Sequence, residues 1–174
     1  METLSAASKI RSNIQELFEA KSLAENAYIR FLLGKDLNVL FPMEEVRESL
    51  LIDTEQITPL PSMHPSTIGM INSRDRVFCI FDLAQILKLP SWSISPRQYQ
   101  VIVMQTKDEL PIYVGLAVAQ LQGIIRLSEG EIQENSAGVS STFTDYISGV
   151  VEQESNALPI LDFNLILQAL TQMG

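Results

Sequence analysis

The sequence has few of the residues on which metal sites, disulfides and membrane anchors depend. Its 174 residues include one cysteine and one histidine, so no intrachain disulfide can form, and a metal site is not expected. Apolar runs stay well below the ~20 residues of a membrane-spanning helix. The N-terminus carries Glu2 and no apolar segment of the signal-peptide kind. We therefore predict a soluble, cytoplasmic protein with no metal, no cofactor and no membrane insertion.

Basic residues are also scarce. Twelve lysines and arginines stand against 21 aspartates and glutamates, which gives a formal net charge of −9. A surface of this sign repels phosphate backbones and anionic lipids, so neither nucleic acid nor a membrane is predicted as a partner. Apolar residues make up 46% of the chain, which is ample for the core of one domain with one or two lobes.

The stretch from Gly69 to Leu87 is the most informative part of the sequence. It has the pattern of a strand, a charged turn, a second strand and a short helix. The second strand, residues 77–81, contains no polar residue, so both of its faces are expected to be buried. Asp82 ends this strand and can cap the following helix, because its carboxylate can accept the free N–H groups of the first turn.

The same pattern recurs near the C-terminus. Gly149 precedes Asp162 by as many positions as Gly69 precedes Asp82, since 162 − 149 and 82 − 69 are both 13. The residues that match across the two copies are Ile80, Asp82, Ile86 and Leu87 in the first and Ile160, Asp162, Ile166 and Leu167 in the second. Two copies predict two similar half-domains, with Ile80 and Ile160 in their cores. Chance similarity between two apolar strands is the alternative.

An amphipathic helix is predicted over residues 5–24. Its apolar stripe, at three- and four-residue spacing, consists of Ile10, Ile14, Leu17, Phe18 and Ala24. A single helix of this length needs a surface on which to dock. We favour packing on its own domain, and a partner-binding or dimerising helix is the alternative.

The rest of the chain favours short strands and tight turns. Strands are predicted over residues 28–33, 37–41, 47–52, 99–105, 112–119 and 120–127, and the second copy closes the chain with a helix from Asp162. This pattern is typical of mostly-β barrels or sandwiches. Because the hairpin unit occurs twice, we expect two small barrels side by side.

No group of residues points to a reaction. The sequence has no glycine-rich phosphate loop, no GxSxG elbow and no CxxC pair. Cys79 lies within an apolar strand, where a buried small hydrophobe is expected. His64 lies in a proline-rich loop and is expected to face solvent. A Cys79–His64 dyad would make the protein a cysteine-dependent enzyme, but binding is the better hypothesis.

Several motifs together resemble those of CheW-like chemotaxis coupling proteins. They are residues 59–61 (PLP), 69–74 (GMINSR), 77–83 (VFCIFDL), 114–118 (VGLAV), 146–151 (YISGVV) and 158–167. The resemblance implies a mostly-β fold of two packed SH3-like β-barrel subdomains over residues 27–174. Residues 1–26 would then be an extra N-terminal helical extension. It also implies a non-catalytic adaptor in the cytoplasm, whose partners are a chemoreceptor's cytoplasmic tip and the regulatory domain of a CheA-type histidine kinase.

The resemblance also implies where partners bind. The family's polar pair of a glutamate and an arginine falls on Glu48 and Arg74, and Val46, Gly69 and Asn72 lie on motif positions near the partner-binding surfaces.

The chain departs from the family pattern at Ser73, Asp75 and residues 119–120. Such divergence suggests a two-component pathway with a special task, such as type IV pilus motility or phototaxis. A structural β-barrel module that dimerises through its N-terminal helix is the other candidate.

Overall fold

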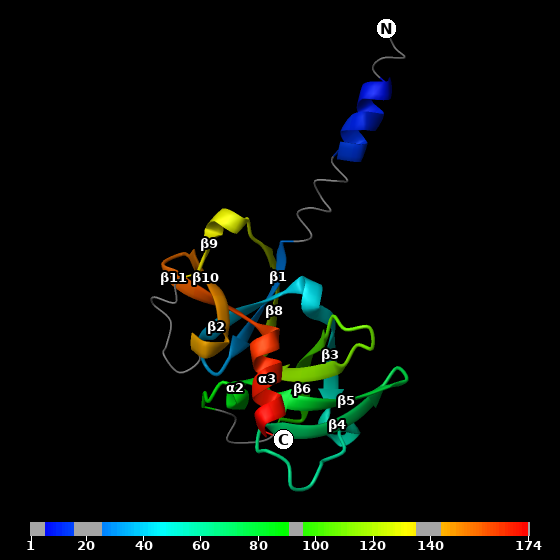
Figure 1. The fold of residues 1–174 in the computed structure, drawn as a ribbon, viewed down its shortest axis with the longest axis vertical. Helices are drawn as coiled ribbons and strands as arrows, with labels where there is room; N and C mark the ends of the chain where they lie inside the picture. The colour runs from blue at the N-terminus through cyan, green and yellow to red at the C-terminus, as the bar shows by residue number, and fades with distance from the viewer. Residues whose placement is uncertain (1–5, 16–25, 91–95, 135–143, 174) are drawn as a thin grey trace.

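Two β-sheets and a C-terminal helix make up most of the computed structural model, which describes residues 6–15, 26–90, 96–134 and 144–173 (Figure 1). The strands are β1 (Ala27–Leu33), β2 (Leu37–Pro42), β3 (Val46–Asp53), β4 (Thr67–Ser73), β5 (Arg76–Asp82), β6 (Gln98–Gln105), β7 (Tyr113–Val118), β8 (Gln120–Arg126), β9 (Ile132–Gln133), β10 (Ile147–Gln153) and β11 (Asn156–Leu161). The helices are α2 (Leu83–Ile86) and α3 (Phe163–Met173), with 3-10 turns η1 (Met43–Glu45), η2 (Thr54–Gln56), η3 (Glu129–Glu131) and η4 (Thr144–Tyr146).

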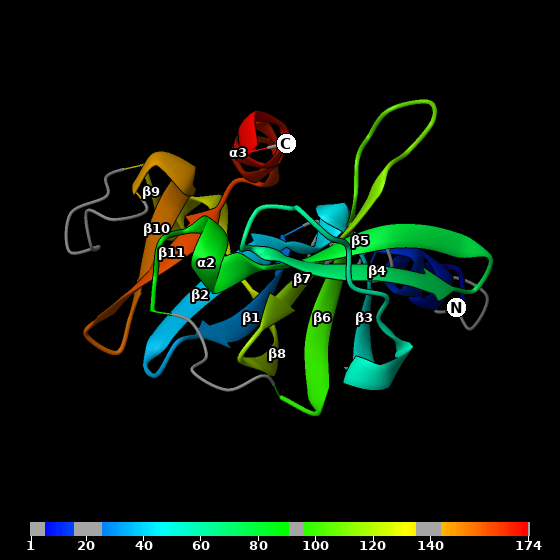
Figure 2. The ribbon, with the colours of Figure 1, turned by 90° about the horizontal axis from the view of Figure 1, so that it is seen from below.

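The chain passes between the two sheets twice. One sheet has the strand order β8-β1-β2-β11-β10-β9 and the other has the order β3-β6-β7-β5-β4. The first two strands therefore belong to the first sheet, the next five form the second, and the chain then returns. Figure 2 shows the two sheets side by side, with α3 lying over the junction. This confirms the predicted mostly-β fold of two barrel-like lobes, of which the second is continuous in sequence and the first combines residues from before and after it.

Three apolar clusters form the core. One lies within the second sheet and includes Ile80, and one lies within the first sheet and includes Ile160. The largest lies between the sheets. It combines β1, β2, β6 and β7 with α2 and α3, and the aromatic rings of Phe31 and Phe41 stack there at 5.4 Å. Ile80 and Ile160 are 0% and 2% exposed, so their predicted places in the cores of the two lobes are confirmed.

The internal repeat is present in three dimensions. Both hairpins, β4–β5 and β10–β11, have a register shift just before their glycine, and Gly69 pairs with Ile80 as Gly149 pairs with Ile160. Each hairpin has one parallel neighbour, β7 for β5 and β2 for β11. Asp82 and Asp162 also act alike, because each accepts the N–H of the residue two positions later.

Both aspartates cap helices, as the sequence predicts. The carboxylate of Asp82 accepts the N–H of Ala84 at 3.1 Å, and that of Asp162 accepts the N–H of Asn164 at 2.9 Å. Each carboxylate thus satisfies N–H groups that a first helical turn leaves without partners.

The prediction that residues 77–81 are buried on both faces is wrong. Phe78 and Ile80 are buried, but Val77 is 60% exposed, and Cys79 and Phe81 are half-buried. Phe78 and Ile80 belong to the apolar cluster of the second sheet, whereas Val77, Cys79 and Phe81 alternate with them and face the other side of the strand. The apolar run therefore correctly predicted a strand, but it wrongly predicted that the outer face of the strand is buried.

The N-terminal helix differs from the favoured prediction. Residues 6–15 are helical, and all ten are exposed, including Ile10 and Ile14 at 60% and 48%. This part of the helix is therefore not packed on the domain. The other members of the stripe, Leu17, Phe18 and Ala24, lie outside the described residues. Among the described residues, no helix combines the length and apolarity needed to cross a bilayer.

Truncation of either repeat isoleucine should destabilise the fold strongly. Ile80→Ala and Ile160→Ala each leave a cavity in a closed apolar cluster, and each should lower the free energy of unfolding by about 2–5 kcal/mol. Glu109→Ala, at an exposed turn position, should change it by less than about 0.5 kcal/mol. Urea unfolding followed by circular dichroism measures all three. Equal midpoints for Ile80→Ala and Glu109→Ala would contradict the burial seen here.

Removal of residues 1–24 should leave a domain that unfolds cooperatively. Residues 6–15 are all exposed and contribute little apolar burial, and the family resemblance begins only at residue 27, so we expect the deletion to remove little of the hydrophobic stabilisation. Thermal unfolding of the full and shortened chains tests this, with Ile10→Ala in the full chain as the control that removes one exposed side chain. Loss of the cooperative transition on shortening would show that the segment belongs to the core. The division into residues 1–26 and 27–174 stays a prediction.

Candidate partner-binding site

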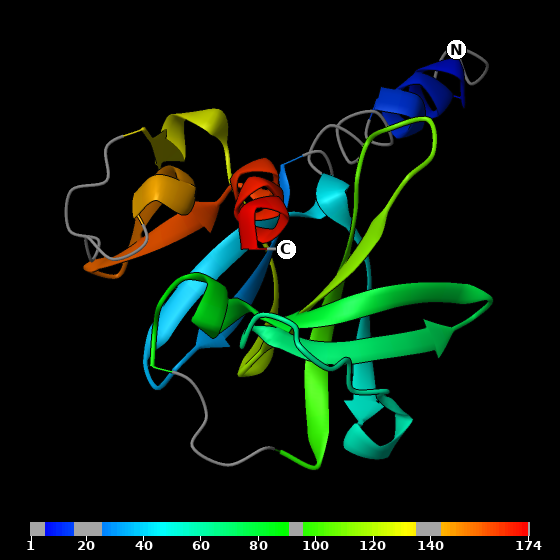
Figure 3. The ribbon, with the colours of Figure 1, turned by 60° about the horizontal axis from the view of Figure 1, so that its bottom comes forward.

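The β4–β5 hairpin carries Arg74 at its tip. Ser73 pairs with Arg76, so Arg74 and Asp75 alone form the turn, with φ values of 51° and 64°. A two-residue hairpin loop of this kind needs positive φ at both positions, where asparagine and glycine are favoured. Figure 3 shows the hairpin extending away from α3, with the turn at its far end. The backbone thus holds an arginine in an uncommon conformation at a protruding point.

Glu48 and Arg74 form the ion pair that the resemblance implies. Arg74 Nη1 lies 2.9 Å from Glu48 Oε2, and the side chains are 76% and 21% exposed. Glu48 lies on β3 directly after a register shift in the β3–β6 pairing. An exposed pair of this kind contributes only ~0.2–1 kcal/mol to stability. Most of the arginine side chain is therefore accessible, while one nitrogen is held by the glutamate.

The other three candidate residues differ in what they expose. Asn72 is exposed on β4 opposite Val77, on the same hairpin as Arg74. Val46 is half-buried and packs against the cluster between the sheets. Gly69 is buried, and a Cβ atom placed there would lie 2.5 Å from the carbonyl oxygen of Thr58. The structure therefore brings Glu48, Arg74 and Asn72 to the accessible surface of one lobe, whereas Val46 is partly covered and Gly69 is buried.

Sequence reasoning missed a second arginine contact beside the hairpin. The guanidinium of Arg76 lies 4.4 Å from the ring centroid of Tyr113, and such a cation–π contact contributes about 0.5–1 kcal/mol at an exposed site. Val77 and Ile112 each add a side chain that is 60% exposed. Val77 and Ile112 lie two positions before Cys79 and Val114, which pair in parallel between β5 and β7. No local signal in the sequence shows that these strands are neighbours.

The turn before Val46 is acidic and partly desolvated. Glu44 pairs with Lys107 at 3.3 Å. Burial raises the pKa of Glu45, an effect that Lys107 opposes and that Asp162 and Glu44 reinforce. The ion pair joins the β6–β7 connection to η1, which precedes β3 and Glu48.

The surroundings of Cys79 and His64 do not support a catalytic dyad of these two residues. Cys79 is half-buried rather than buried, between Met70 of β4 and Val114 of β7. His64 is exposed, as predicted, and its Nδ1 accepts the N–H of Ser66 at 3.1 Å. Within the described ranges, no group of three or more potential ligands could hold a metal ion.

Comparisons with known proteins agree on one family. The model of the CheW-like domain family matches residues 27–171. A chemotaxis protein CheW of Thermotoga maritima is 29% identical over 122 residues, which are 70% of this chain and 76% of that protein. A chemotaxis protein CheW of Bacillus subtilis is 32% identical over 110 residues, which are 63% and 68% of the two chains.

A solved structure agrees with the fold. The scaffolding protein TtCheW of Thermoanaerobacter tengcongensis superposes with a TM-score of 0.66 at 18% identity, over 79% of this chain and 89% of that one. At this identity, the likeness supports the arrangement of the two lobes.

Gly69 should matter for stability and not as a contact. In Gly69→Ala the new methyl group would collide with the backbone of Thr58 and with Ile57, and the φ of 157° adds strain. We expect a lower thermal midpoint than in the unchanged protein. Gly130→Ala, whose Cβ would meet nothing within 4 Å, is the matched control and should leave the midpoint nearly unchanged. Equal midpoints for the two variants would contradict the close approach.

Proposed function

Because the chain belongs to the family of CheW-like domains, we propose that it is a non-catalytic adaptor that couples a chemoreceptor to a CheA-type histidine kinase. The names of the two curated relatives, both chemotaxis proteins, and of the scaffolding protein with the same fold support this proposal. The adaptor would contact the cytoplasmic tip of the receptor and the regulatory domain of the kinase, and it would act in the cytoplasm.

The ion pair at the hairpin tip is the observation that carries the proposal. Arg74 comes from the β4–β5 turn and Glu48 from β3, and their side chains meet at 2.9 Å with the arginine side chain 76% exposed. A structural role alone would not need the arginine to protrude, because an exposed pair stabilises a fold very little. Arginine is enriched among the residues that dominate protein–protein binding energy. The pair is thus suited to orient Arg74 toward a partner.

The residues around Arg74 also bear on the signalling pathway in which the adaptor would act. Ser73 and Asp75 replace the residues that flank the arginine in the family pattern, and Asp75 adopts φ of 64° where that pattern has glycine. A changed hairpin tip suits a receptor or kinase that differs from the common ones. We therefore assign the adaptor to a specialised system, such as type IV pilus motility or phototaxis.

A second candidate function rests on the N-terminal helix. Ile10 and Ile14 are one turn apart, and both are exposed in a helix of which no described residue is buried. Two exposed apolar side chains on one helix face, which no other described residue covers, favour a structural module that dimerises through this helix. Sedimentation of the full chain and of the chain without residues 1–24 distinguishes the candidates, because only dimerisation through the helix predicts a change of mass from dimer to monomer.

Arg74→Ala should weaken binding while leaving the fold intact. Truncation of an arginine hot spot costs at least ~2 kcal/mol, which is about thirtyfold in affinity. We expect at least a tenfold loss of affinity for the receptor tip or for the kinase regulatory domain, measured by calorimetry with purified fragments. The thermal midpoint should move by only a few degrees, because the lost ion pair contributes at most ~1 kcal/mol.

Three further variants control this measurement. Glu154→Ala changes the matching turn position of the β10–β11 hairpin, where φ is 49°, and should move the thermal midpoint by a similar amount. Arg97→Ala removes another exposed arginine and should leave both affinities unchanged. Glu48→Ala should weaken the same contact as Arg74→Ala, and the double variant should lose less than the sum. Unchanged affinity for both partners in Arg74→Ala would reduce this turn to a structural feature.

A further inference from the structure

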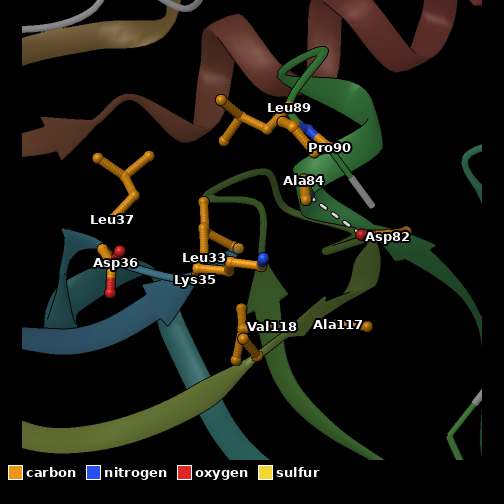
Figure 4. A pocket seen from close by; sticks show the side chains of 12 residues that line it. Leu33, Lys35, Asp36, Leu37, Asp82, Ala84, Leu89, Pro90, Ala117 and Val118 are labelled. Atoms are coloured by element: carbon orange, nitrogen blue, oxygen red, sulfur yellow. Dashed lines mark hydrogen bonds between the residues drawn. The ribbon is translucent and has the colours of Figure 1, made fainter. Parts of the chain in front are cut away.

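A large cavity opens between the two lobes, away from the Arg74 hairpin. It has a volume of 670 Å³, which lies in the range of ~300–1,000 Å³ that is usual for small-molecule sites. The walls come from the β1–β2 turn of the first sheet and from β5, α2 and the end of β7 in the second lobe. Figure 4 shows leucines 33, 37 and 89 and Val118 around it, so most of the lining is apolar.

One buried charge lies on the wall of this cavity. Asp82 is 5% exposed, and its carboxylate accepts the backbone N–H of Ala84 at 3.1 Å. The backbone of Gln85 donates a second hydrogen bond to Asp82. A carboxylate has about four acceptor sites, so these two hydrogen bonds leave capacity for another donor. Neither of the two ion pairs that occur among the described residues includes Asp82. Desolvation raises the pKa of Asp82, although the backbone hydrogen bonds from Gln85 and Ala84 oppose this rise. A raised pKa is expected for a carboxylate that burial has removed from water without a countercharge.

The other charges of the cavity are weaker determinants of its ligand. Lys35 and Asp36 both lie at the exposed β1–β2 turn, and Figure 4 shows the amino group of Lys35 directed over the cavity. Charges in contact with solvent are screened, and an exposed pair is worth at most about 1 kcal/mol. They also have opposite signs. A buried carboxylate without a cation is much more costly, so Asp82 decides which charge the cavity accepts.

We propose that the cavity is a binding site for a small amphipathic amine, whose cationic group pairs with Asp82 and whose apolar body lies against the leucines and Val118. Capping of α2 does not explain why Asp82 lines a cavity. Asp162 makes the same cap on α3 in the other lobe and does not line this cavity. Since the walls come from both lobes, such a ligand would bind across their junction. Binding of such a ligand does not depend on the adaptor function proposed above.

Two probes of equal chain length, n-octylamine and 1-octanol, test the proposal on the full chain at pH 7.5. Each is titrated below its aggregation or solubility limit, and the backbone amide shifts of Ala84, Leu89, Ala117 and Ala119 are followed by NMR. We expect saturable shifts at these residues and an affinity for octylamine at least tenfold higher than that for octanol. Shifts that appear elsewhere, no saturable shifts, or equal affinities for the two probes would overturn the proposal.

Matched variants separate Asp82 from the general attraction of an acidic protein for cations. Asparagine is as good a helix cap as aspartate, so Asp82→Asn removes the charge and keeps the cap. It should reduce the preference for octylamine to less than threefold. Asp162→Asn makes the same change in the other lobe and should leave the preference intact. If Asp82→Asn does not fold, Asp82→Ser, which also caps, replaces it. A preference that survives removal of the Asp82 charge, or that Asp162→Asn also abolishes, would rule out this site.

Discussion

The apolar cluster between the two sheets is the constraint on which the rest of the structure depends. Strands of both sheets contribute to it, and Phe163 and Ile166 of α3 complete it from the C-terminal end of the chain. Burial of apolar area is the main favourable contribution to folding, so neither lobe can be understood as an independent barrel. The chain leaves the first sheet after β2 and returns only at β8. The lobes therefore have to fold against each other.

The repeat shows what one hairpin unit requires wherever it occurs. A glycine must follow the register shift, because a Cβ atom at Gly69 or Gly149 would approach Ile57 or Ile132 to within 2.6 or 2.8 Å. An aspartate must end the second strand, because the helix that follows needs a cap. The exposed turn residues differ between the two copies of the hairpin. The turn of one hairpin is Arg74-Asp75 and that of the other is Glu154-Ser155, all at positive φ.

The candidate site could be predicted only in part, and only through resemblance. Glu48 and Arg74 are 26 positions apart, and no spacing rule links a residue on an edge strand to a residue in a hairpin turn. The resemblance named both, and their ion pair agrees with it. Arg76 and Tyr113 were missed, because their contact depends on the parallel pairing of β5 with β7. Such pairing joins segments that nothing in the local sequence connects.

The strands, the turns, the two caps and the repeat could all be predicted from the amino-acid sequence, because they depend on backbone preferences and on neighbours within a few positions. Which apolar side chains are covered depends instead on how the sheets and helices pack together. Val77 lies in an apolar strand and remains 60% exposed, and the outer face of a strand is buried only where another element packs on it. This packing also placed Asp82 on the wall of a cavity between the lobes while Asp162 makes the same cap on α3. Local chemistry is the same at both aspartates, and only the packing of the two lobes distinguishes them.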